Sequence, residues 1–316
     1  MSGGSADPGT ETHPIIRMAA TVADDEGERI MRVFQTIKSM IFAGIGITVV
    51  TPLLAETPLE RGAYLMNSIA ACGNCHTPLT PTGPAMNMEL AGRLVDDNPM
   101  FTAYAPNITP DTETGIGDWT DVELIKAIRE GVRPDGTIIG PPMPIGLYRG
   151  ISDTDVKAIV AYMRSLPAVK NEVPASIYRI PLPPAYGPPV GTVADVPAGV
   201  TTEYGAYLAG PVGHCIECHT PMGPKGPDFT NQLGAGGFEF HGPWGVSISA
   251  NLTSGKDGIK KYSDSELIAM ITEGNRADGS RMNPPMGYGF YANMTKDDLA
   301  AVIAYLRALP AKPSPK

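Results

Sequence analysis

The strongest constraint on the fold of this chain is an internal repeat, in which one segment recurs after 143 positions. The sequence CGNCHTP at 72–78 returns as CIECHTP at 215–221, and AIVAYMRSLP at 158–167 returns as AVIAYLRALP at 301–310. Matches at one offset across so much of the chain indicate a duplicated structural unit. The length of 316 residues also suits two domains. We therefore expect two similar domains in tandem.

The repeat and the composition of the segments around it divide the chain into five parts. Polar, acidic residues without periodicity precede the first apolar run, and a stretch dense in proline separates the two copies. The expected parts are residues 1–30, disordered or upstream of the true start codon; 31–55, a signal peptide or N-terminal anchor; 56–170, the first domain; 171–199, an extended proline-rich linker; and 200–312, the second domain.

Residues 31–55 have the pattern of an export signal. Arg32 and Lys38 precede the apolar run 40–55, and the small Ala55 offers a cleavage position. The sixteen apolar residues are fewer than the roughly 20 that span a bilayer, which favours cleavage over an uncleaved anchor. Both alternatives place the rest of the chain in the periplasm; an anchor would hold it to the outer face of the cytoplasmic membrane through residues 37–55.

Helix signals dominate each repeat. Thr57 and Glu60 form a predicted capping box, as do Thr120 and Glu123, and an apolar stripe in the last helix ends at Pro167. Convincing alternating strands are absent from the sequence pattern. We therefore expect a mainly α fold of short helices joined by loops. So few helices bury little apolar surface, which indicates that a large hydrophobic group fills the centre of each unit.

The two CxxCH motifs contain all four cysteines of the chain and two of its five histidines. Two thiols separated by two residues can add to both vinyl groups on one edge of a porphyrin, and the adjacent histidine then reaches the iron. The motifs thus predict two covalently attached haem c groups. The predicted attachment and ligand residues are Cys72, Cys75 and His76 in the first unit, and Cys215, Cys218 and His219 in the second.

Two other uses of a CxxCH motif are less compatible with the sequence. A structural zinc site needs a fourth ligand, and neither His214 nor His241 has a counterpart in the first unit. A thioredoxin-like dithiol needs a βαβ setting, which the helical, Gly- and Pro-rich pattern does not provide.

Methionines at matched positions are the best candidates for the second axial ligand of each iron. Met143 and Met286 each lie 67 residues beyond the motif histidine, and each follows Pro-Pro, which stiffens the chain. A thioether suits haem iron and holds its potential high. The sequence therefore predicts iron coordination by His76 with Met143 and by His219 with Met286.

Five further residues have a functional and a structural interpretation. Trp119 and Tyr262 either donate a hydrogen bond to a haem propionate or pack against a helix. Asn107 and Asn251 either shape a loop over the haem or make Asx-turns. Arg93 either pairs with a propionate or is a solvated surface arginine.

Two segments carry a resemblance to a known family. NITPDTETGIGDWTDVELIKAIREGV at 107–132 and PPMPIGLYRGISDTDVKAIVAYMRSLP at 141–167 resemble class I c-type cytochromes, in particular the cytochrome c subunits of bacterial membrane-bound alcohol, aldehyde and sugar dehydrogenases. The resemblance covers residues from about 57 to 310. It implies two tandem class I cytochrome c domains, each with short helices around a covalently bound haem, and the same His–Met axial pairs.

These features together predict an electron-transfer protein rather than an enzyme. Irons with two protein ligands have no open position for a substrate, so they would only exchange electrons. The expected partners are a dehydrogenase donor and an oxidase or soluble cytochrome acceptor; the net charge of −9 argues against nucleic acid. The alternative is a dihaem redox enzyme of the peroxidase or thiosulfate dehydrogenase type. An obligate subunit and a free shuttle also remain alternatives.

Overall fold

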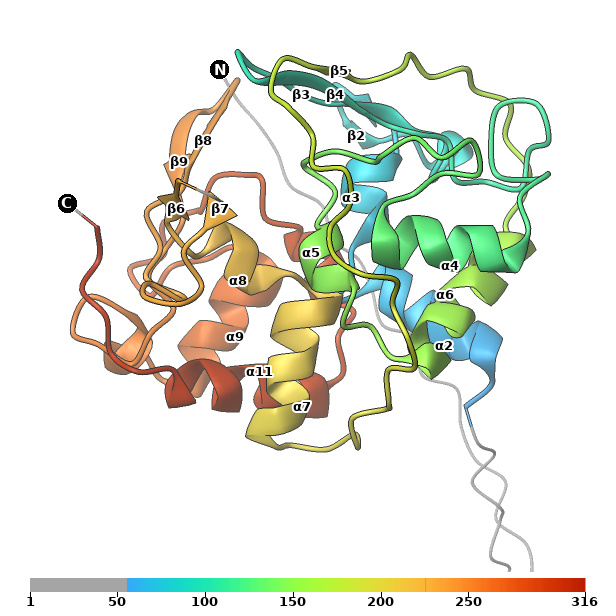
Figure 1. Cartoon of the computed structure of the whole chain (residues 1–316). Helices are drawn as coiled ribbons and strands as arrows, with labels where there is room; N and C mark the ends of the chain where they lie inside the picture. The colour runs from blue at the N-terminus through green and yellow to red at the C-terminus, as the bar shows by residue number, and fades with distance from the viewer. Residues whose placement is uncertain (1–55, 225, 316) are drawn as a thin grey trace, which may run out of the picture. The chain divides into compact units, whose positions relative to one another are not determined.

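The computed structural model describes residues 56–224 and 226–315, which include both repeats (Figure 1). The predicted signal or anchor at 31–55 and residues 1–30 lie outside the described residues. The first repeat contains the helices α2 (Pro58–Asn67), α3 (Cys72–His76), η1 (Met86–Met88), α4 (Asp121–Glu130), α5 (Ile145–Tyr148) and α6 (Asp153–Ser165). The second contains α7 (Thr202–Tyr207), the π-helix η2 (Leu208–Val212), α8 (Cys215–Cys218), η3 (Ile259–Lys261), α9 (Asp264–Glu273), α10 (Tyr288–Tyr291) and α11 (Lys296–Ala308). The order of α-helices is therefore the same in both repeats, as the prediction of two similar domains in tandem requires.

The predicted capping boxes begin the helices. In α2, the Glu60 amide donates to Thr57 Oγ1 at 3.2 Å, and the Thr57 amide donates to Glu60 Oε2 at 2.8 Å. The same reciprocal pair begins α4 and, with Ser263, α9. These bonds satisfy amides that the first turn of a helix leaves free. The capping boxes of α4 and α9 lie at equivalent points of the two repeats.

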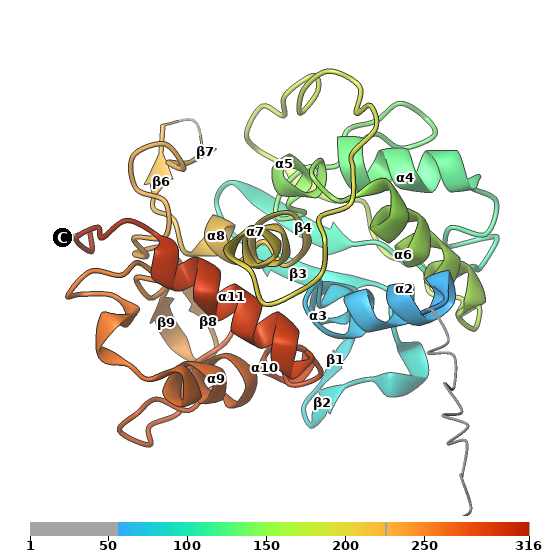
Figure 2. The ribbon, with the colours of Figure 1, turned by 90° about the horizontal axis from the view of Figure 1, so that it is seen from below.

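The first and last helices of each repeat cross at a glycine. Figure 2 shows α2 beside α6 and α7 beside α11. A Cβ atom at Gly62 would lie 1.9 Å from the carbonyl oxygen of Ala158, and one at Gly205 would lie 1.9 Å from that of Ala301. Only a residue without a side chain allows this approach, so the repeated GAY sequence determines how closely the helices pack.

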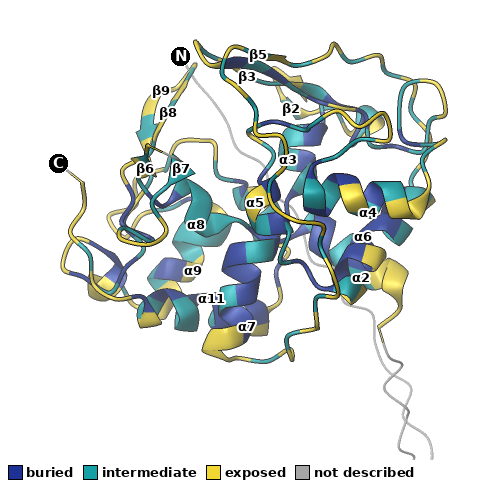
Figure 3. Ribbon diagram, in the orientation of Figure 1, coloured by how far each residue is buried: buried dark blue, intermediate teal, exposed yellow. Residues whose placement is uncertain are grey.

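The predicted apolar stripes form the core of both repeats (Figure 3). The α6 residues and their α11 counterparts are all less than 6% exposed. They are Val156, Ile159, Val160, Met163, Leu299, Val302, Ile303 and Leu306. The 3.6-residue period of the sequence thus identified the buried faces correctly.

The mainly α prediction is confirmed, and the structure adds short strands that the sequence pattern did not indicate. Short hairpins follow each CxxCH helix. They are β1 (Leu79–Thr80) with β2 (Gly83–Pro84), β3 (Arg93–Asp97) with β4 (Phe101–Ala105), β6 (Met222–Gly223) with β7 (Gly226–Pro227), and β8 (Glu239–Gly242) with β9 (Gly245–Ile248). Strands of two to five residues are too short for an alternating pattern to stand out from loop sequence.

The proline-rich stretch 171–199, predicted as an extended linker, packs in part on the first repeat. Within this stretch, the strand β5 (Ile177–Tyr178) pairs antiparallel with β4 and completes a three-stranded sheet in the order β3-β4-β5. Arg149 Nη2 donates to the carbonyl oxygen of Pro188 at 2.5 Å, which holds a later part of the stretch to the first repeat. The segment is therefore packed along the first repeat over part of its length.

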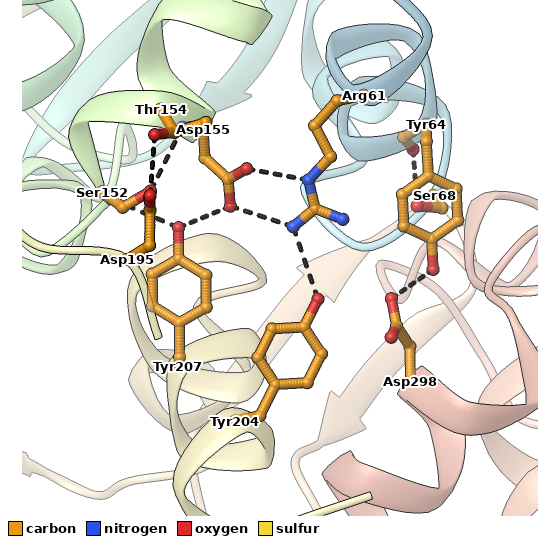
Figure 4. A network of polar contacts seen from close by, with 10 residues as sticks. All are labelled: Arg61, Tyr64, Ser68, Ser152, Thr154, Asp155, Asp195, Tyr204, Tyr207 and Asp298. Carbon is orange, nitrogen blue, oxygen red and sulfur yellow. Dashed lines mark hydrogen bonds and ion pairs between the residues drawn. The ribbon is translucent and has the colours of Figure 1, made fainter. Parts of the chain in front are cut away.

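The two repeats exchange tyrosine–carboxylate hydrogen bonds (Figure 4). Tyr64 Oη on α2 donates to Asp298 Oδ2 on α11 at 2.5 Å, and Tyr207 Oη on α7 donates to Asp155 Oδ2 on α6 at 2.7 Å. Both tyrosines and both aspartates are separated by the repeat offset of 143, so the contact is symmetric. These bonds hold the two repeats to each other.

None of the helices in the described part of the chain is both long and apolar enough to cross a membrane.

Candidate cofactor sites

The first CxxCH motif lies on α3, and one ring nitrogen of its histidine has no hydrogen-bond partner among the described residues. His76 is 7% exposed, and its Nδ1 lies 2.8 Å from the carbonyl oxygen of Pro106. Because a carbonyl only accepts hydrogen bonds, Nδ1 carries the proton and Nε2 keeps its lone pair. A backbone acceptor at the outer nitrogen is the usual arrangement of a histidine that binds a metal through the other nitrogen.

The second motif reproduces this geometry on α8. His219 is 8% exposed, and its Nδ1 lies 2.7 Å from the carbonyl oxygen of Ala250. The residue before each motif adopts a left-handed conformation, with φ of 47° at Ala71 and 40° at His214. The chain therefore enters both motifs in the same way and presents the same imidazole nitrogen.

A glycine beside each motif determines the position of its histidine. The Gly92 amide donates to the carbonyl oxygen of His76 at 2.6 Å, and the Gly236 amide donates to that of His219 at 2.8 Å. Both glycines have positive φ, and a Cβ at either would lie 2.6 Å from a backbone atom. The chain that leads into each hairpin, β3–β4 or β8–β9, is thus tied directly to the motif histidine.

The four thiols are free and partly buried. Burial raises the pKa of Cys72 to about 12 and that of Cys215 to about 11. Zinc binding and thiol exchange both use the thiolate, which an environment of this kind disfavours. Among the described residues, no three His, Cys, Asp or Glu side chains gather in a way that could hold a metal ion.

Met143 and Met286 lie at equivalent places, directly before α5 and α10. Both are partly buried, and Met143 packs against the hydrophobic core. Met86 and Met222, by contrast, are 66% and 57% exposed. Met88 and Met282, which also have no counterpart, are half-buried like the matched pair, so it is the equivalent position, and not burial, that distinguishes Met143 and Met286.

Arg93, the first residue of β3, has a side-chain nitrogen that finds no hydrogen-bond partner in the part of the chain that the structure describes. Its Nη1 donates to the Leu94 carbonyl at 2.8 Å and its Nη2 to the Asn74 carbonyl at 2.6 Å. Its Nε is buried and has no hydrogen-bond partner among the described residues. Buried donors are rarely left unpaired, so this atom suits an anionic group of a bound cofactor. Gly237 occupies the equivalent position in the second repeat.

For the asparagines, the structural interpretation is confirmed. Asn107 Oδ1 accepts from the Thr109 amide at 2.9 Å and Asn251 Oδ1 from the Thr253 amide at 2.8 Å, which are Asx-turns. The Asn107 amide group also donates to Val169 O at 2.7 Å, so the turn secures the chain that leaves α6.

Trp119 and Tyr262 pack against the hydrophobic core, as their structural interpretation predicts. Their backbone carbonyls accept hydrogen bonds from Arg164 and Arg307, the arginines near the ends of α6 and α11. Sequence reasoning did not single out these arginines, although the offset of 143 between them was a usable signal.

The two motifs also touch the opposite repeat. Asn74 Nδ2, between the cysteines of the first motif, donates to the Pro285 carbonyl, next to Met286, at 3.1 Å. In return, the ring of Tyr148, on the helix after Met143, lies edge-on to His214 with 5.9 Å between centroids. The methionine segment of each repeat is therefore in contact with the CxxCH segment of the other. The sequence of each repeat on its own gives no signal for these contacts, because they join residues of different repeats.

Comparison with known proteins identifies the two units. The cytochrome c family model matches residues 59–167 and 204–310. The chain is similar to the cytochrome c subunit of the quinone alcohol dehydrogenase of Gluconobacter oxydans, with 31% identity over 286 residues that cover 83% of this chain and 56% of that protein. It is also similar to a nicotinate dehydrogenase subunit of Pseudomonas putida, with 32% identity over 81% of this chain and 22% of that protein.

A third relative is the diheme cytochrome c-type of Cereibacter sphaeroides, 28% identical over 76% of this chain and 82% of that protein. The chain thus spans about half of the alcohol dehydrogenase subunit and about a fifth of the nicotinate dehydrogenase subunit. Cytochrome c domains hold haem c covalently, and a chain with two of them binds two such groups. With matches over both repeats, this chain belongs to the cytochrome c family as a tandem of two cytochrome c domains.

Proposed function

We propose that this protein is a dihaem electron carrier that takes electrons from a dehydrogenase. The observation that carries the proposal is the pair of equivalent buried imidazoles, His76 and His219, each with Nδ1 bound to a backbone carbonyl. The two haem groups would supply one-electron chemistry at iron. The protein's part is to bind them, orient the ligands and adjust the two potentials.

In this proposal, each domain supplies two thioether links and two iron ligands. Cys72 and Cys75 attach the first haem, and Cys215 and Cys218 attach the second. The hydrogen bond from each histidine Nδ1 fixes the ring plane and the tautomer, so that Nε2 is the ligand atom. The thioethers of Met143 and Met286 would be the second protein ligand of each iron. Arg93 binds a propionate of the first haem, because its buried Nε lacks a partner among the described residues.

Two similar ligand sets favour electron transfer over catalysis. A dihaem redox enzyme requires one iron with a vacant or displaceable position. Here the segments around both methionines have the same Pro-Pro-Met sequence and the same half-buried position. We therefore assign no catalytic residue.

The chain's relatives suggest its partners and location. Dehydrogenase cytochrome subunits from Gluconobacter and Pantoea are among its relatives, so we propose a dehydrogenase as donor and an oxidase or soluble cytochrome as acceptor. The proposed domains are 56–170 and 200–312. We place the protein in the periplasm, exported by residues 31–55 or anchored by them.

Substitution of each methionine by alanine tests the assignment of Met143 and Met286 as iron ligands. Met143→Ala and Met286→Ala are each expected to lower the potential of one haem and leave the other near its original value, because loss of the thioether destabilises ferrous iron. A spectroscopic redox titration of the holoprotein measures both haems. Met86→Ala, an exposed methionine in the first domain, is the matched control. An unchanged titration for either ligand variant contradicts the assignment, and a high-spin haem or peroxide turnover by the unaltered protein would favour the enzyme alternative.

A further inference from the structure

We propose that the loop before α9, in the second domain, binds an acidic surface of a partner protein. The loop, residues 254–262, follows the Asx-turn at Asn251 and includes η3. It carries Lys256, Lys260 and Lys261, which we call the lysine patch, and all three are exposed. The observation that points to a partner is the equivalent loop of the first domain, which contains no basic residue.

The two loops are equivalent because each is held by a buried isoleucine. In the first domain, the Ile116 amide donates to the Thr109 carbonyl at 3.0 Å. In the second domain, the Ile259 amide donates to the Thr253 carbonyl at 2.9 Å. Both isoleucines are 4% exposed. The residues that follow the isoleucine therefore occupy the same places in both domains.

The residues at these matched places differ in charge. Gly117 and Asp118 follow the isoleucine of the first domain, whereas Lys260 and Lys261 follow that of the second. Asp118 and both lysines are exposed. The turn itself requires neither charge, because the buried isoleucine and its backbone bond hold it in both domains. The change from acidic to basic thus concerns what the surface of the loop meets.

The charges of the two loops also differ as a whole. Residues 254–262 contain three lysines and one carboxylate, Asp257, whereas residues 110–119 contain three carboxylates and no basic residue. Among the described residues, none of the three lysines lies within ion-pair distance of a carboxylate. In the first domain, Glu113 is paired with Lys170. Unpaired charges of one sign produce a field beyond the protein surface, so the lysine patch attracts anionic groups.

The lysine patch stands on a tightly packed support. A Cβ atom at Gly258 would lie 2.1 Å from the carbonyl oxygen of Thr253, so the loop packs closely on the chain that leads into it. The Ser254 hydroxyl donates to the Leu309 carbonyl at 2.7 Å, which joins the loop to the end of α11. Groups presented from a fixed backbone lose less conformational freedom on binding than groups on a loose one. The loop is therefore preorganised for a partner.

A protein fits this surface better than a membrane does. Peripheral binding to a bilayer combines basic residues with apolar side chains that enter the interface. In residues 254–262, Ile259 is 4% exposed and Tyr262 is half-buried, so no large apolar side chain stands out beside the lysines. Asp257 would be repelled by an anionic bilayer, but it can accept hydrogen bonds from a protein. Three cations around one carboxylate suit a discrete acidic surface.

The acidic loop of a second copy is a poorer match for the lysine patch than a different protein is. In residues 110–119, Asp111 accepts hydrogen bonds within its own loop, and Glu113 is paired with Lys170. Among the described residues, only Asp118 of these three carboxylates makes no such bond. A contact between two different faces of one chain would also repeat without closing and produce open chains of copies. The acidic surface therefore belongs to another polypeptide.

A partner on the lysine patch would lie on the domain of the second motif. Ala250, whose carbonyl accepts from His219 Nδ1, is followed by Asn251, whose Asx-turn leads into the loop. The inference rests on the proposed function only in one respect, which is that the partner is a redox protein. Recognition by charge does not depend on that function.

The test is photo-cross-linking of the full holoprotein, mixed with the periplasmic and membrane fractions of its own host. A benzophenone amino acid replaces Asp257, and the same amino acid at Glu113, in the equivalent loop, is the matched control. We expect a cross-link from position 257 to one acidic polypeptide, and none to that polypeptide from position 113. Cross-links only to lipid or to a second copy, equal yields at both positions, or none at all would overturn the inference.

Substitution of the lysines tests whether charge is what the partner recognises. Replacement of all three lysines of the patch by glutamine, with the probe at position 257, should reduce the yield roughly tenfold, the effect of three exposed ion pairs. The control removes the same charge from exposed helix positions. Its substitutions are Lys126→Gln, Lys157→Gln and Lys296→Gln. An unchanged yield in the patch variant, or an equal loss in the control, contradicts recognition by this loop.

Salt provides a measurement that needs no substitution. The yield from position 257 should fall between about 20 mM and about 200 mM salt, because exposed charges are screened over this range. A yield that does not depend on salt contradicts the inference. Haem content and redox titration of the same samples report on the proposed function independently. A chain without haem that still forms the charge-dependent cross-link would contradict electron transfer and leave the docking surface intact.

Discussion

Asp155 and Asp298 occupy the same position of the last helix in their domains, yet their surroundings differ. Asp155 accepts from Tyr207, and Arg61 binds it with Nε at 2.7 Å and Nη2 at 3.0 Å. Asp298 accepts from Tyr64, but Tyr204 stands where the first domain has Arg61. Figure 4 shows the arginine between the two halves of the network, where it also reaches Tyr204 Oη at 3.4 Å.

The comparison shows which features duplication has kept. Both domains retain the helix crossing at glycine, the tyrosine–aspartate exchange and the bonded histidine. The differences are in charge and in the sheet edges: Arg61 and Arg93 belong to the first domain alone, and so, among the described residues, does the third strand. The cofactor geometry is therefore common to both domains, while the local electrostatic field and the outer surface are not.

The largest expected difference concerns the two aspartates. Asp155→Asn leaves the guanidinium of Arg61, whose side chain is only 18% exposed, without its carboxylate. We expect a loss of about 3 kcal/mol in the free energy of unfolding, at the low end for a broken buried ion pair. Asp298→Asn weakens one hydrogen bond and should cost about 1 kcal/mol.

Guanidinium unfolding of the holoprotein, followed by circular dichroism, measures both losses. Asp121→Asn is the control, because Asp121 pairs with Arg164 at a side chain that is 69% exposed and should change stability by about 0.5 kcal/mol or less. Equal losses at Asp155 and Asp298 would mean that Arg61 adds no stability and that the domains do not differ in this respect.

The second difference concerns the residue that enters each motif, Ala71 in the first domain and His214 in the second. Burial lowers the pKa of His214 to about 4. The unfolded chain then binds more protons than the folded chain between pH 6.5 and 4, so stability falls as pH decreases through this range. For a half-buried ring we expect a loss of roughly 1–2 kcal/mol.

His214→Ala should remove this part of the pH dependence, since His76 and His219 remain in both proteins. Unfolding free energies at about pH 7 and about pH 4.5 test it, with the exposed His241→Ala as control. A His214→Ala protein that loses as much stability on acidification as the unaltered protein would show that the two entry residues are equivalent.

The third difference concerns charge near the proposed haems. Arg93 lies close to Cys75, and Gly237 takes its place in the second domain. A nearby cation favours the added electron of ferrous iron, so Arg93→Ala should lower one of the two potentials. An interaction of about 1 kcal/mol corresponds to roughly 40 mV for one electron. Redox titration measures it, with the exposed Arg276→Ala as control; a shift of both potentials by the same amount would contradict a local effect.

The sequence was sufficient to predict features that are periodic, that recur in both repeats or that follow a cofactor-attachment motif. The capping residue Thr57, the stripe that includes Val156 and both CxxCH motifs could be read directly, because each obeys a rule of spacing. A strand of two residues, such as Ile177–Tyr178, has no period to read. The bond of Tyr64 to Asp298 joins residues 234 positions apart. Only the recurrence of tyrosine and aspartate at the offset of 143 hinted that they serve one purpose.

The smallest expected effect concerns the third strand, β5. A substitution beside this strand should make the β4 edge of the first domain resemble the β9 edge of the second domain, which is unpaired among the described residues. Ser176→Ala removes the hydroxyl that accepts from the Tyr104 amide. The loss of this bond should cost about 1 kcal/mol or less, and hydrogen exchange of the Tyr104 amide should become faster, toward the rate of the Ile248 amide in the isolated protein. Ser165→Ala, whose hydroxyl donates to Tyr162 O at an exposed helix end, is the control. If the Tyr104 and Ile248 amides already exchange at the same rate in the unaltered protein, the two sheet edges do not differ in solution, and the contrast between covered and open hairpins is lost.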